Sequence, residues 1–272
     1  MSSNSRPDKT QVVALCIILA AVLVGSVIAI GLIGKSATKP SGESETQSTA
    51  EFTTEALPPE AESKLIVIDA GHQSKGNYEK EPVGPGAAEM KNKVAAGTTG
   101  VSTKLAEYKL TLMVAEKLQK ILEERGYKTV MIRTTHDVNI SNAERAEMAN
   151  ELSADAFIRI HANGSTDADA NGILTICQTK SNPYNGELYE QSRLLSEAVL
   201  DEMVESTDAK RLYVWETDTM SGINWCQVPV TIVEMGFMSN KEEDEKMATD
   251  AYQELLALGI ANGIDRYFEN DK

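Results

Sequence analysis

Three short apolar runs place the strongest limit on how this chain can fold. They cover residues 65–72, 156–161 and 228–234, and they end in His72, His161 and Glu234. Apolar runs of this length are typical of buried strands, and open α/β sheets bind ligands beyond the carboxyl ends of their strands. Two of the three histidines in the chain stand at these run ends. The pattern therefore indicates one shared site, and it favours a metal hydrolase.

The segments between these runs alternate between helical and extended patterns. Ser141 and Glu144 have the spacing of a capping box, and Ser239 and Glu242 repeat it. Further strands are expected over residues 128–133, 172–178 and 211–214, and helices over 110–125, 142–152, 186–203 and 252–268. The last helix is expected to face inward with Leu255, Leu256, Leu258, Gly259, Ile260, Ile264 and Tyr267. This order predicts a single α/β domain, a mostly parallel or mixed sheet of about six strands with helices on both faces.

The N-terminal part has a different composition. Residues 12–33 contain no charged side chain, and at ~1.5 Å per residue they would span roughly the 30 Å hydrocarbon core of a bilayer. We therefore expect a short tail over 1–10, a transmembrane anchor over 11–34, a disordered linker over 35–63 and a catalytic domain over 64–272. A signal peptide that is cleaved near residues 24–26 is the alternative to the anchor.

The net charge limits the classes of molecule that this protein is expected to bind. The chain has 26 Lys and Arg against 41 Asp and Glu, a net charge of −15, which argues against nucleic acid or anionic lipid as the main partner.

Cys16 lies in the expected anchor, while Cys177 and Cys226 could pair or stay free, and the sequence does not decide between these states. The stretch over 73–106 is rich in Gly and Pro, and loops of this length usually bind ligands or are disordered.

The residues at the run ends suit zinc chemistry. Catalytic zinc (Zn2+) takes three protein ligands and leaves a fourth position for water. His72 and His161 would supply two ligands from adjacent parallel strands, whereas no strand leads to His136. Glu234 has the chemistry of a general base at the third run end. Each residue also has a simpler interpretation, because a histidine at a strand end is often a hydrogen-bonded loop residue and Glu234 precedes a turn.

A third ligand is harder to identify from the residues alone. Glu107 stands where the long loop meets the first helix, and the residue three positions earlier, Lys104, offers no capping box to explain it. An equally good interpretation is a first-turn carboxylate that favours the helix dipole. Arg145, Glu144 and Glu242 are interpreted as structural residues, because capping and surface pairing explain them.

Three sequence segments resemble a known family. Residues 68–72 (IDAGH), 157–163 (FIRIHAN) and 233–240 (VEMGFMSN) are similar to the signatures of the zinc-dependent N-acetylmuramoyl-L-alanine amidases of the amidase 3 family. Arg133, Arg145 and Asn150 resemble the pattern between them. The chain departs from many relatives at Gln73 and Ser74, where they have two glycines, and its loop to Glu107 is longer.

The resemblance implies a function for these residues. His72, Glu107 and His161 would bind zinc, and Glu234 would be the catalytic glutamate in hydrolysis of the amide between N-acetylmuramic acid and L-alanine. Peptidoglycan would be the main partner, the membrane would be contacted through the N-terminal helix, and the domain would face the cell wall outside the membrane, or be secreted after signal cleavage. A protein activator is left open. A zinc peptidase that cuts within the stem peptide, and a wall-binding or activator module without activity, are the alternatives.

Overall fold

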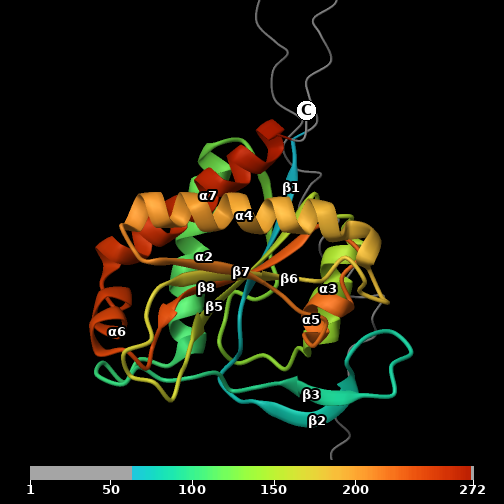
Figure 1. The fold of residues 1–272 in the computed structure, drawn as a ribbon, viewed down its shortest axis with the longest axis horizontal. Coiled ribbons are helices and arrows are strands. Elements are labelled where there is room, and N and C mark those ends of the chain that lie inside the picture. Colours follow the sequence, from blue (N-terminus) through green and yellow to red (C-terminus); the bar gives the residue numbers. More distant parts are fainter. Residues whose placement is uncertain (1–62, 271–272) are drawn as a thin grey trace, which may run out of the picture. The chain divides into compact units, whose positions relative to one another are not determined.

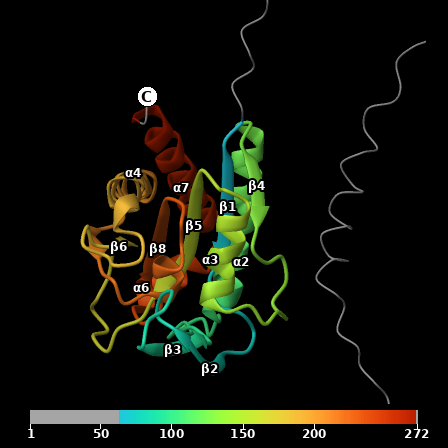
Figure 2. The ribbon, with the colours of Figure 1, turned by 90° about the vertical axis from the view of Figure 1, so that its right-hand side faces the viewer.

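The apolar runs build the central strands of a six-stranded sheet. The computed structural model describes residues 63–270, and its main sheet has the order β4-β1-β5-β8-β6-β7. The strands are β1 (Leu65–Ala70), β4 (Lys128–Met131), β5 (Ala156–Asn163), β6 (Ile173–Cys177), β7 (Arg211–Glu216) and β8 (Val230–Phe237). Figure 2 shows β6, β8, β5 and β1 following one another across the sheet.

The sheet is mixed, as the alternation of strands and helices predicted. Four neighbouring pairs run parallel, and only β6 and β8 run antiparallel. Because β1, β5 and β8 are adjacent and parallel, their carboxyl ends lie along the same edge of the sheet (Figure 1). The strands that carry His161 and Glu234 extend three residues or fewer beyond them, so these side chains project from the last part of each strand rather than from the following loop.

Two hydrophobic clusters cover the two faces of the sheet. One cluster packs Ile66, Ile158 and Val233 against three long helices, α2 (Glu107–Glu124), α4 (Tyr189–Thr207) and α7 (Asp250–Asn270). The other packs Val67 and Phe157 against two shorter helices, α3 (Asn142–Glu151) and α5 (Ser221–Asn224). Helices on both faces are therefore confirmed, and the second face is the more thinly covered one.

Two glycines allow α7 and α4 to approach closely. A Cβ atom at Gly259 would lie 2.6 Å from Cα of Met203, and one at Gly263 would lie 2.4 Å from Cα of Val199. Real Cβ atoms do not come this close to a neighbouring backbone, so only glycine fits at these two positions. This close packing holds α4 and α7 together on the face of the sheet that the three long helices cover.

The long stretch over 73–106 contains secondary structure that the sequence did not predict. It forms an antiparallel hairpin of β2 (Asn77–Pro82) and β3 (Met90–Val94), which makes its own two-stranded sheet. Figures 1 and 2 show this hairpin apart from the main sheet. Trp225 Nε1 donates to the carbonyl oxygen of Pro82 at 2.9 Å, and Asn224 Nδ2 donates to that of Val83 at 3.0 Å. These contacts attach the hairpin to α5.

The ends of several helices differ from the expected ones. A 3-10 turn, η1 (Gly186–Leu188), precedes α4, and α4 continues to Thr207. The expected capping box at Ser239 is wrong, because α6 (Lys241–Met247) begins after Asn240, whose side chain accepts from the backbone N–H groups of Glu242 and Glu243. Ser239 instead accepts a hydrogen bond from the N–H of Ser165. The capping box at Ser141 and Glu144 is confirmed.

The inward face of the last helix is narrower than predicted. Leu256, Ile260, Ile264 and Tyr267 are buried, but Leu255 and Leu258 are 39% and 37% exposed. At ~100° per residue Leu258 points to the side opposite Leu256, so one apolar face cannot include both.

The expected N-terminal tail, the transmembrane anchor and nearly all of the linker lie outside the described residues. None of the helices in the part that the structure describes is both long and apolar enough to span a bilayer.

Candidate metal centre

His72 follows β1 directly and is held by its backbone and its ring. Its φ angle is +60°, in the left-handed region that non-glycine residues rarely adopt. Nδ1 lies 2.9 Å from the carbonyl oxygen of Ala95, and because a carbonyl oxygen only accepts, Nδ1 carries the proton. In the neutral form of the ring the lone pair is therefore on Nε2, which faces Glu107 and His161.

His161 projects from β5 toward the same point. Its Nδ1 lies 3.0 Å from Nε2 of His72 and 3.3 Å from Oε1 of Glu107. Gly71 leaves the space for this ring, since a Cβ atom there would fall 2.4 Å from Cε1 of His161. Burial lowers the pKa of His161 to about 4, so that the ring is neutral at physiological pH. Its Nε2 is buried and has no hydrogen-bond partner among the described residues.

Glu107 is the first residue of α2 and is almost fully buried. Oε1 lies 2.9 Å from Nε2 of His72 and accepts from the N–H of Ala162 at 3.1 Å, while Oε2 accepts from the N–H of Thr98 at 2.8 Å. The carboxylate thus contacts β5 and the loop before the helix. Burial alone would raise its pKa, but His161 and His72 outweigh that effect and hold the pKa well below the usual value.

These three side chains fit a zinc ion. One ligand atom from each residue lies within 4.8 Å of the others, and two imidazole nitrogens and one carboxylate oxygen form a known catalytic zinc set. Nε2 of His72 lies 2.9 Å from a carboxylate oxygen, a contact that is favourable only when a proton or a metal ion is shared between the two atoms. The neutral His161 and charged Glu107 are also the protonation states that bind metals.

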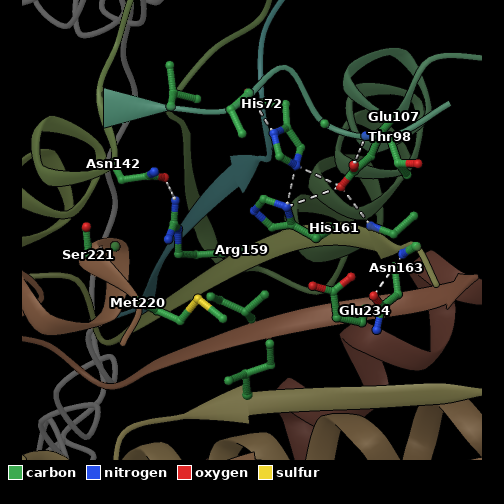
Figure 3. Close-up of a pocket in the computed structure, with 18 of the residues that line it drawn as sticks. His72, Thr98, Glu107, Asn142, Arg159, His161, Asn163, Met220, Ser221 and Glu234 are labelled. Atoms are coloured by element: carbon green, nitrogen blue, oxygen red, sulfur yellow. Dashed lines mark hydrogen bonds and ion pairs between the residues drawn. The ribbon is translucent and has the colours of Figure 1, made fainter. Parts of the chain in front are cut away.

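Glu234 lies beside the three residues, as Figure 3 shows. It is the register partner of His161 in the parallel pair of β5 and β8. Its Oε2 is buried without a hydrogen-bond partner among the described residues. Burial, and then the charge of Glu107, raise the pKa of Glu234 well above the usual value. A carboxyl group in this state exchanges protons closer to neutral pH, as acid–base catalysis requires.

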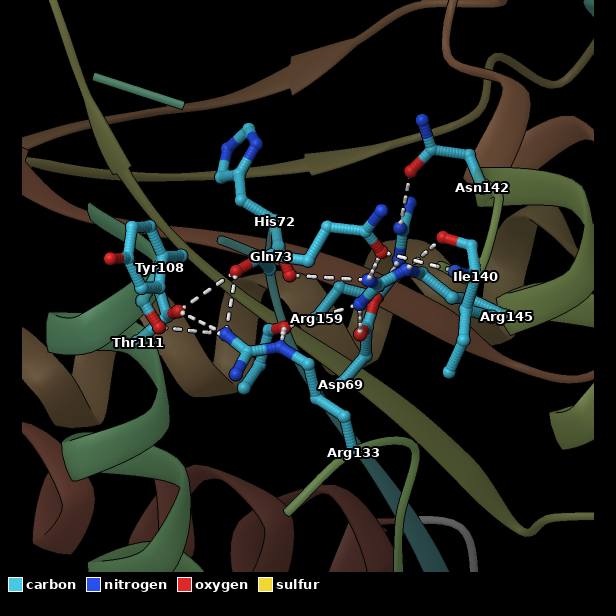
Figure 4. Close-up of polar contacts among 12 residues, drawn as sticks. Asp69, His72, Gln73, Tyr108, Thr111, Arg133, Ile140, Asn142, Arg145 and Arg159 are labelled. Carbon is cyan, nitrogen blue, oxygen red and sulfur yellow. Dashed lines mark hydrogen bonds and ion pairs between the residues drawn. The ribbon is translucent and has the colours of Figure 1, made fainter. Parts of the chain in front are cut away.

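A buried network of arginines supports the exit of β1 (Figure 4). Asp69 binds Arg145 at 2.5 Å and Arg159 at 2.9 Å. Arg145 also donates to the carbonyl oxygen of His72 at 3.1 Å, and Arg133 donates to those of Ala70 and Gly71. Sequence reasoning interpreted Arg145 as structural, and these contacts agree, because it fixes the backbone that presents His72.

All four predicted residues line one cavity of about 640 Å³. Lys91, Asn92, Gly97 and Thr98 also line it, so the long stretch over 73–106 forms part of its wall, as expected.

His136 lies outside this cavity and packs against the ring of Tyr108 at 5.2 Å between centroids. Sequence reasoning did not assign Arg159 to the cavity, although its position two residues before His161 on a strand was a usable signal. Cys177 and Cys226 are both free and buried.

Comparison with known proteins finds similarity to N-acetylmuramoyl-L-alanine amidases in both sequence and structure. The family model described as N-acetylmuramoyl-L-alanine amidase matches residues 66–266. The Bacillus subtilis protein YqiI is 31% identical over 208 residues, which cover 76% of this chain and 86% of the relative. The amidase Ami1 of Mycobacterium smegmatis has a TM-score of 0.68 at 24% identity, covering 76% of this chain and 97% of that structure. An N-acetylmuramoyl-L-alanine amidase of Clostridium difficile 630 has a TM-score of 0.63 at 25% identity, covering 77% and 99%.

Proposed function

This chain belongs to the amidase 3 family of N-acetylmuramoyl-L-alanine amidases, and we propose that it cleaves peptidoglycan with a zinc ion bound by His72, Glu107 and His161. The bond cut is the amide between the lactyl group of N-acetylmuramic acid and L-alanine. The observation that carries the proposal is the convergence of Nε2 of His72, Nδ1 of His161 and Oε1 of Glu107 beside the unpartnered Oε2 of Glu234.

The roles of the chain's own residues follow from their positions. A zinc ion held by His72, Glu107 and His161 would supply Lewis-acid polarisation of the amide carbonyl and would lower the pKa of water toward ~7. Glu234 takes the proton from the attacking water and delivers it to the nitrogen of L-alanine as the amide breaks. The hydrogen bonds from Ala162 and Thr98 hold Glu107 in one orientation, and Ala95 does the same for His72. Such supporting contacts keep metal ligands in place.

The cellular location is also a proposal. Residues 12–33 carry no charge, and we propose that residues 11–34 anchor the protein in the membrane and that residues 64–272 act outside it on the cell wall. A linker of roughly 30 residues behaving as a coil would extend on the order of 30 Å, which keeps the domain near the membrane-proximal wall. Detection of residues 11–34 in the mature protein by mass spectrometry supports the anchor, whereas their loss supports secretion.

The alternative enzyme, a zinc peptidase acting within the stem peptide, uses the same chemistry on a different amide. Mass spectrometry of digested peptidoglycan separates the two. Amidase activity releases stem peptides that begin with a free L-alanine and leaves glycan strands without peptides. Peptidase activity leaves L-alanine attached to the muramic acid. Release of neither product by the zinc-loaded protein would favour a wall-binding or activator module.

Glu234→Gln tests the catalytic role directly. The amide keeps the shape of the side chain but cannot take a proton, so we expect zinc content to be unchanged and alanine release to fall by about 10²–10⁴-fold. Glu242→Gln, at an exposed position of α6, is the matched control and should behave like the unmodified protein. Full turnover by Glu234→Gln would refute the assigned role.

A further inference from the structure

Two basic residues, Lys91 and Arg159, line the cavity apart from the proposed zinc ligands and Glu234, and Arg159 is the buried one. Arg159 stands two residues before His161 on β5, and residues two apart in a strand face the same side of the sheet. Figure 3 shows its guanidinium group beside Asn142 and Ser221, away from Glu234. The proposed chemistry leaves this arginine without a role.

Arg159 carries positive charge that its neighbours do not fully balance. Its Nε donates to Oδ2 of Asp69, and Oδ1 of the same carboxylate accepts from Arg145. One carboxylate therefore faces two guanidinium groups. Among the described residues that line the cavity, the only carboxylates are Glu107 and Glu234, so the part near Arg159 has a positive surplus.

The guanidinium group of Arg159 is held in one position. Nη2 donates to Oδ1 of Asn142 at 2.9 Å, and only 3% of the residue is exposed. A Cβ atom at Gly222 would lie 1.6 Å from Nη1, so the group rests against backbone where only glycine leaves room. Nη1 has no hydrogen-bond partner among the residues that the structure describes. A fixed guanidinium with a free donor is suited to binding a carboxylate.

We propose that Arg159 binds a carboxylate in the peptide part of the substrate, on the residue that follows L-alanine. The proposal rests on the proposed function, because it takes the scissile amide to lie at His161 and Glu234. Two residues along β5 separate Arg159 from His161 by about 6.6 Å. An extended peptide of two residues spans at most about 7 Å. A carboxylate on the second stem residue therefore reaches Arg159 when the amide occupies the proposed centre.

The test compares two synthetic N-acetylmuramoyl-L-alanyl peptides that differ at one group. In one, the second residue carries a free carboxylate, and in the other this carboxylate is a neutral amide. The zinc-loaded full chain is expected to have a kcat/KM at least about tenfold higher for the carboxylate form, the usual effect of one hydrogen bond to a charged group. In Arg159→Gln this ratio should fall to about one. A partial loss of folded, active enzyme lowers kcat/KM for both peptides by the same factor, so it leaves their ratio unchanged.

Arg145→Gln is the matched control. It removes the same charge from the same cluster, but Arg145 is fully buried and does not line the cavity. Asp69 keeps one arginine partner in either variant. We expect Arg145→Gln to retain most of the preference, and Arg159→Lys to retain part of it. An unchanged ratio in Arg159→Gln, or an equal loss in both glutamine variants, would overturn direct binding by Arg159.

A binding measurement separates this proposal from the proposed function. Calorimetry of the full chain with the free product peptide, in its carboxylate and amide forms, requires no hydrolysis. Tighter binding of the carboxylate form that disappears in Arg159→Gln supports the subsite even if no amide is cleaved. Equal binding of both forms by the unmodified protein contradicts the subsite even if the amidase is active.

Discussion

His161 of β5 and Glu234 of β8 are register partners in adjacent parallel strands. Neighbouring strands lie ~4.8 Å apart, so this pairing sets a proposed zinc ligand beside the proposed general base without any help from a loop. Both residues also carry a buried polar atom that has no hydrogen-bond partner among the described residues, Nε2 of His161 and Oε2 of Glu234. The sheet thus fixes the positions of His161 and Glu234 relative to each other, while the loop over 73–106 and α2 contribute the other residues of the candidate site.

Replacement of Gly97 tests how tightly the ligands are packed. A Cβ atom there would lie 2.8 Å from Oε2 of Glu107 and 2.9 Å from Cγ of His72, so Gly97→Ala displaces both side chains. We expect zinc affinity, measured by competition with a chromogenic chelator, to fall about 10–100-fold, the usual effect of disturbing groups that orient ligands. Gly86→Ala is the control, because Gly86 also has a positive φ but nothing within 4 Å. Unchanged zinc affinity in Gly97→Ala would contradict this geometry.

Acid should weaken the fold partly through Asp69. Burial alone would raise its pKa, but Arg145 and Arg159 outweigh that effect and hold the pKa of Asp69 well below its usual value. Because the folded pKa is depressed, the stabilisation is complete above the unfolded pKa of ~3.9 and is lost as pH falls toward the folded value.

Asp69→Asn should therefore show a smaller loss of unfolding free energy between pH 5 and 2.5, by urea denaturation. At pH 7 it should be about 3–5 kcal/mol less stable, since a buried ion pair loses one partner. Asp137→Asn, at an exposed position, is the control. The same acid profile in Asp69→Asn and the unmodified protein would show that Asp69 does not contribute to acid sensitivity.

Gly263→Ala should destabilise the protein although alanine is the better helix former. In an exposed helix the change would stabilise by ~0.8–1.0 kcal/mol. Here the new Cβ would lie 2.4 Å from Cα of Val199, and overpacking of this kind costs about 1–3 kcal/mol. Urea denaturation measures the difference, with Glu254→Ala at an exposed position of α7 as the control. A more stable Gly263→Ala variant would mean that α4 and α7 are farther apart.

The two cysteines of the described domain should be unreactive in the native protein. Burial raises the pKa of both Cys177 and Cys226 to about 12, so very little thiolate forms at pH 8. We expect iodoacetamide to label each residue far more slowly before than after unfolding in urea, with peptide mass spectrometry as the readout. Rapid native labelling, or recovery of a disulfide between the two, would contradict the structure.

The sequence predicted the parts of the site that follow from local patterns. Short apolar runs and helical spacing placed His72, His161 and Glu234 at the ends of neighbouring strands, because strand direction and connection rules leave few arrangements. Glu107 remained ambiguous, since a first-turn carboxylate has the same sequence signature as a metal ligand. The contacts that favour the ligand role, to Ala162 and to His72, join segments that are distant in the chain.

Other features depended on tertiary contacts that no local pattern contains. The β2–β3 hairpin was missed because its strands carry mostly polar, exposed residues and lack apolar alternation. Asn240 and Ser239 are both good capping residues, and the bond from Ser165 to Ser239 leaves Asn240 to cap α6. Arg159 is a single charged residue within an apolar run of the sequence, and only the tertiary structure places Asp69, Asn142 and Gly222 around it.

The central claim is that zinc bound by His72, Glu107 and His161 cleaves the muramoyl amide. The most direct measurement is the release of N-terminal alanine from purified peptidoglycan by the full chain, before and after chelation and after zinc is restored, together with His161→Ala. We predict release that stops on chelation, returns with about one equivalent of zinc, and is lost in His161→Ala. Release that continues in the metal-free protein, or at an undiminished rate in His161→Ala, would contradict the account.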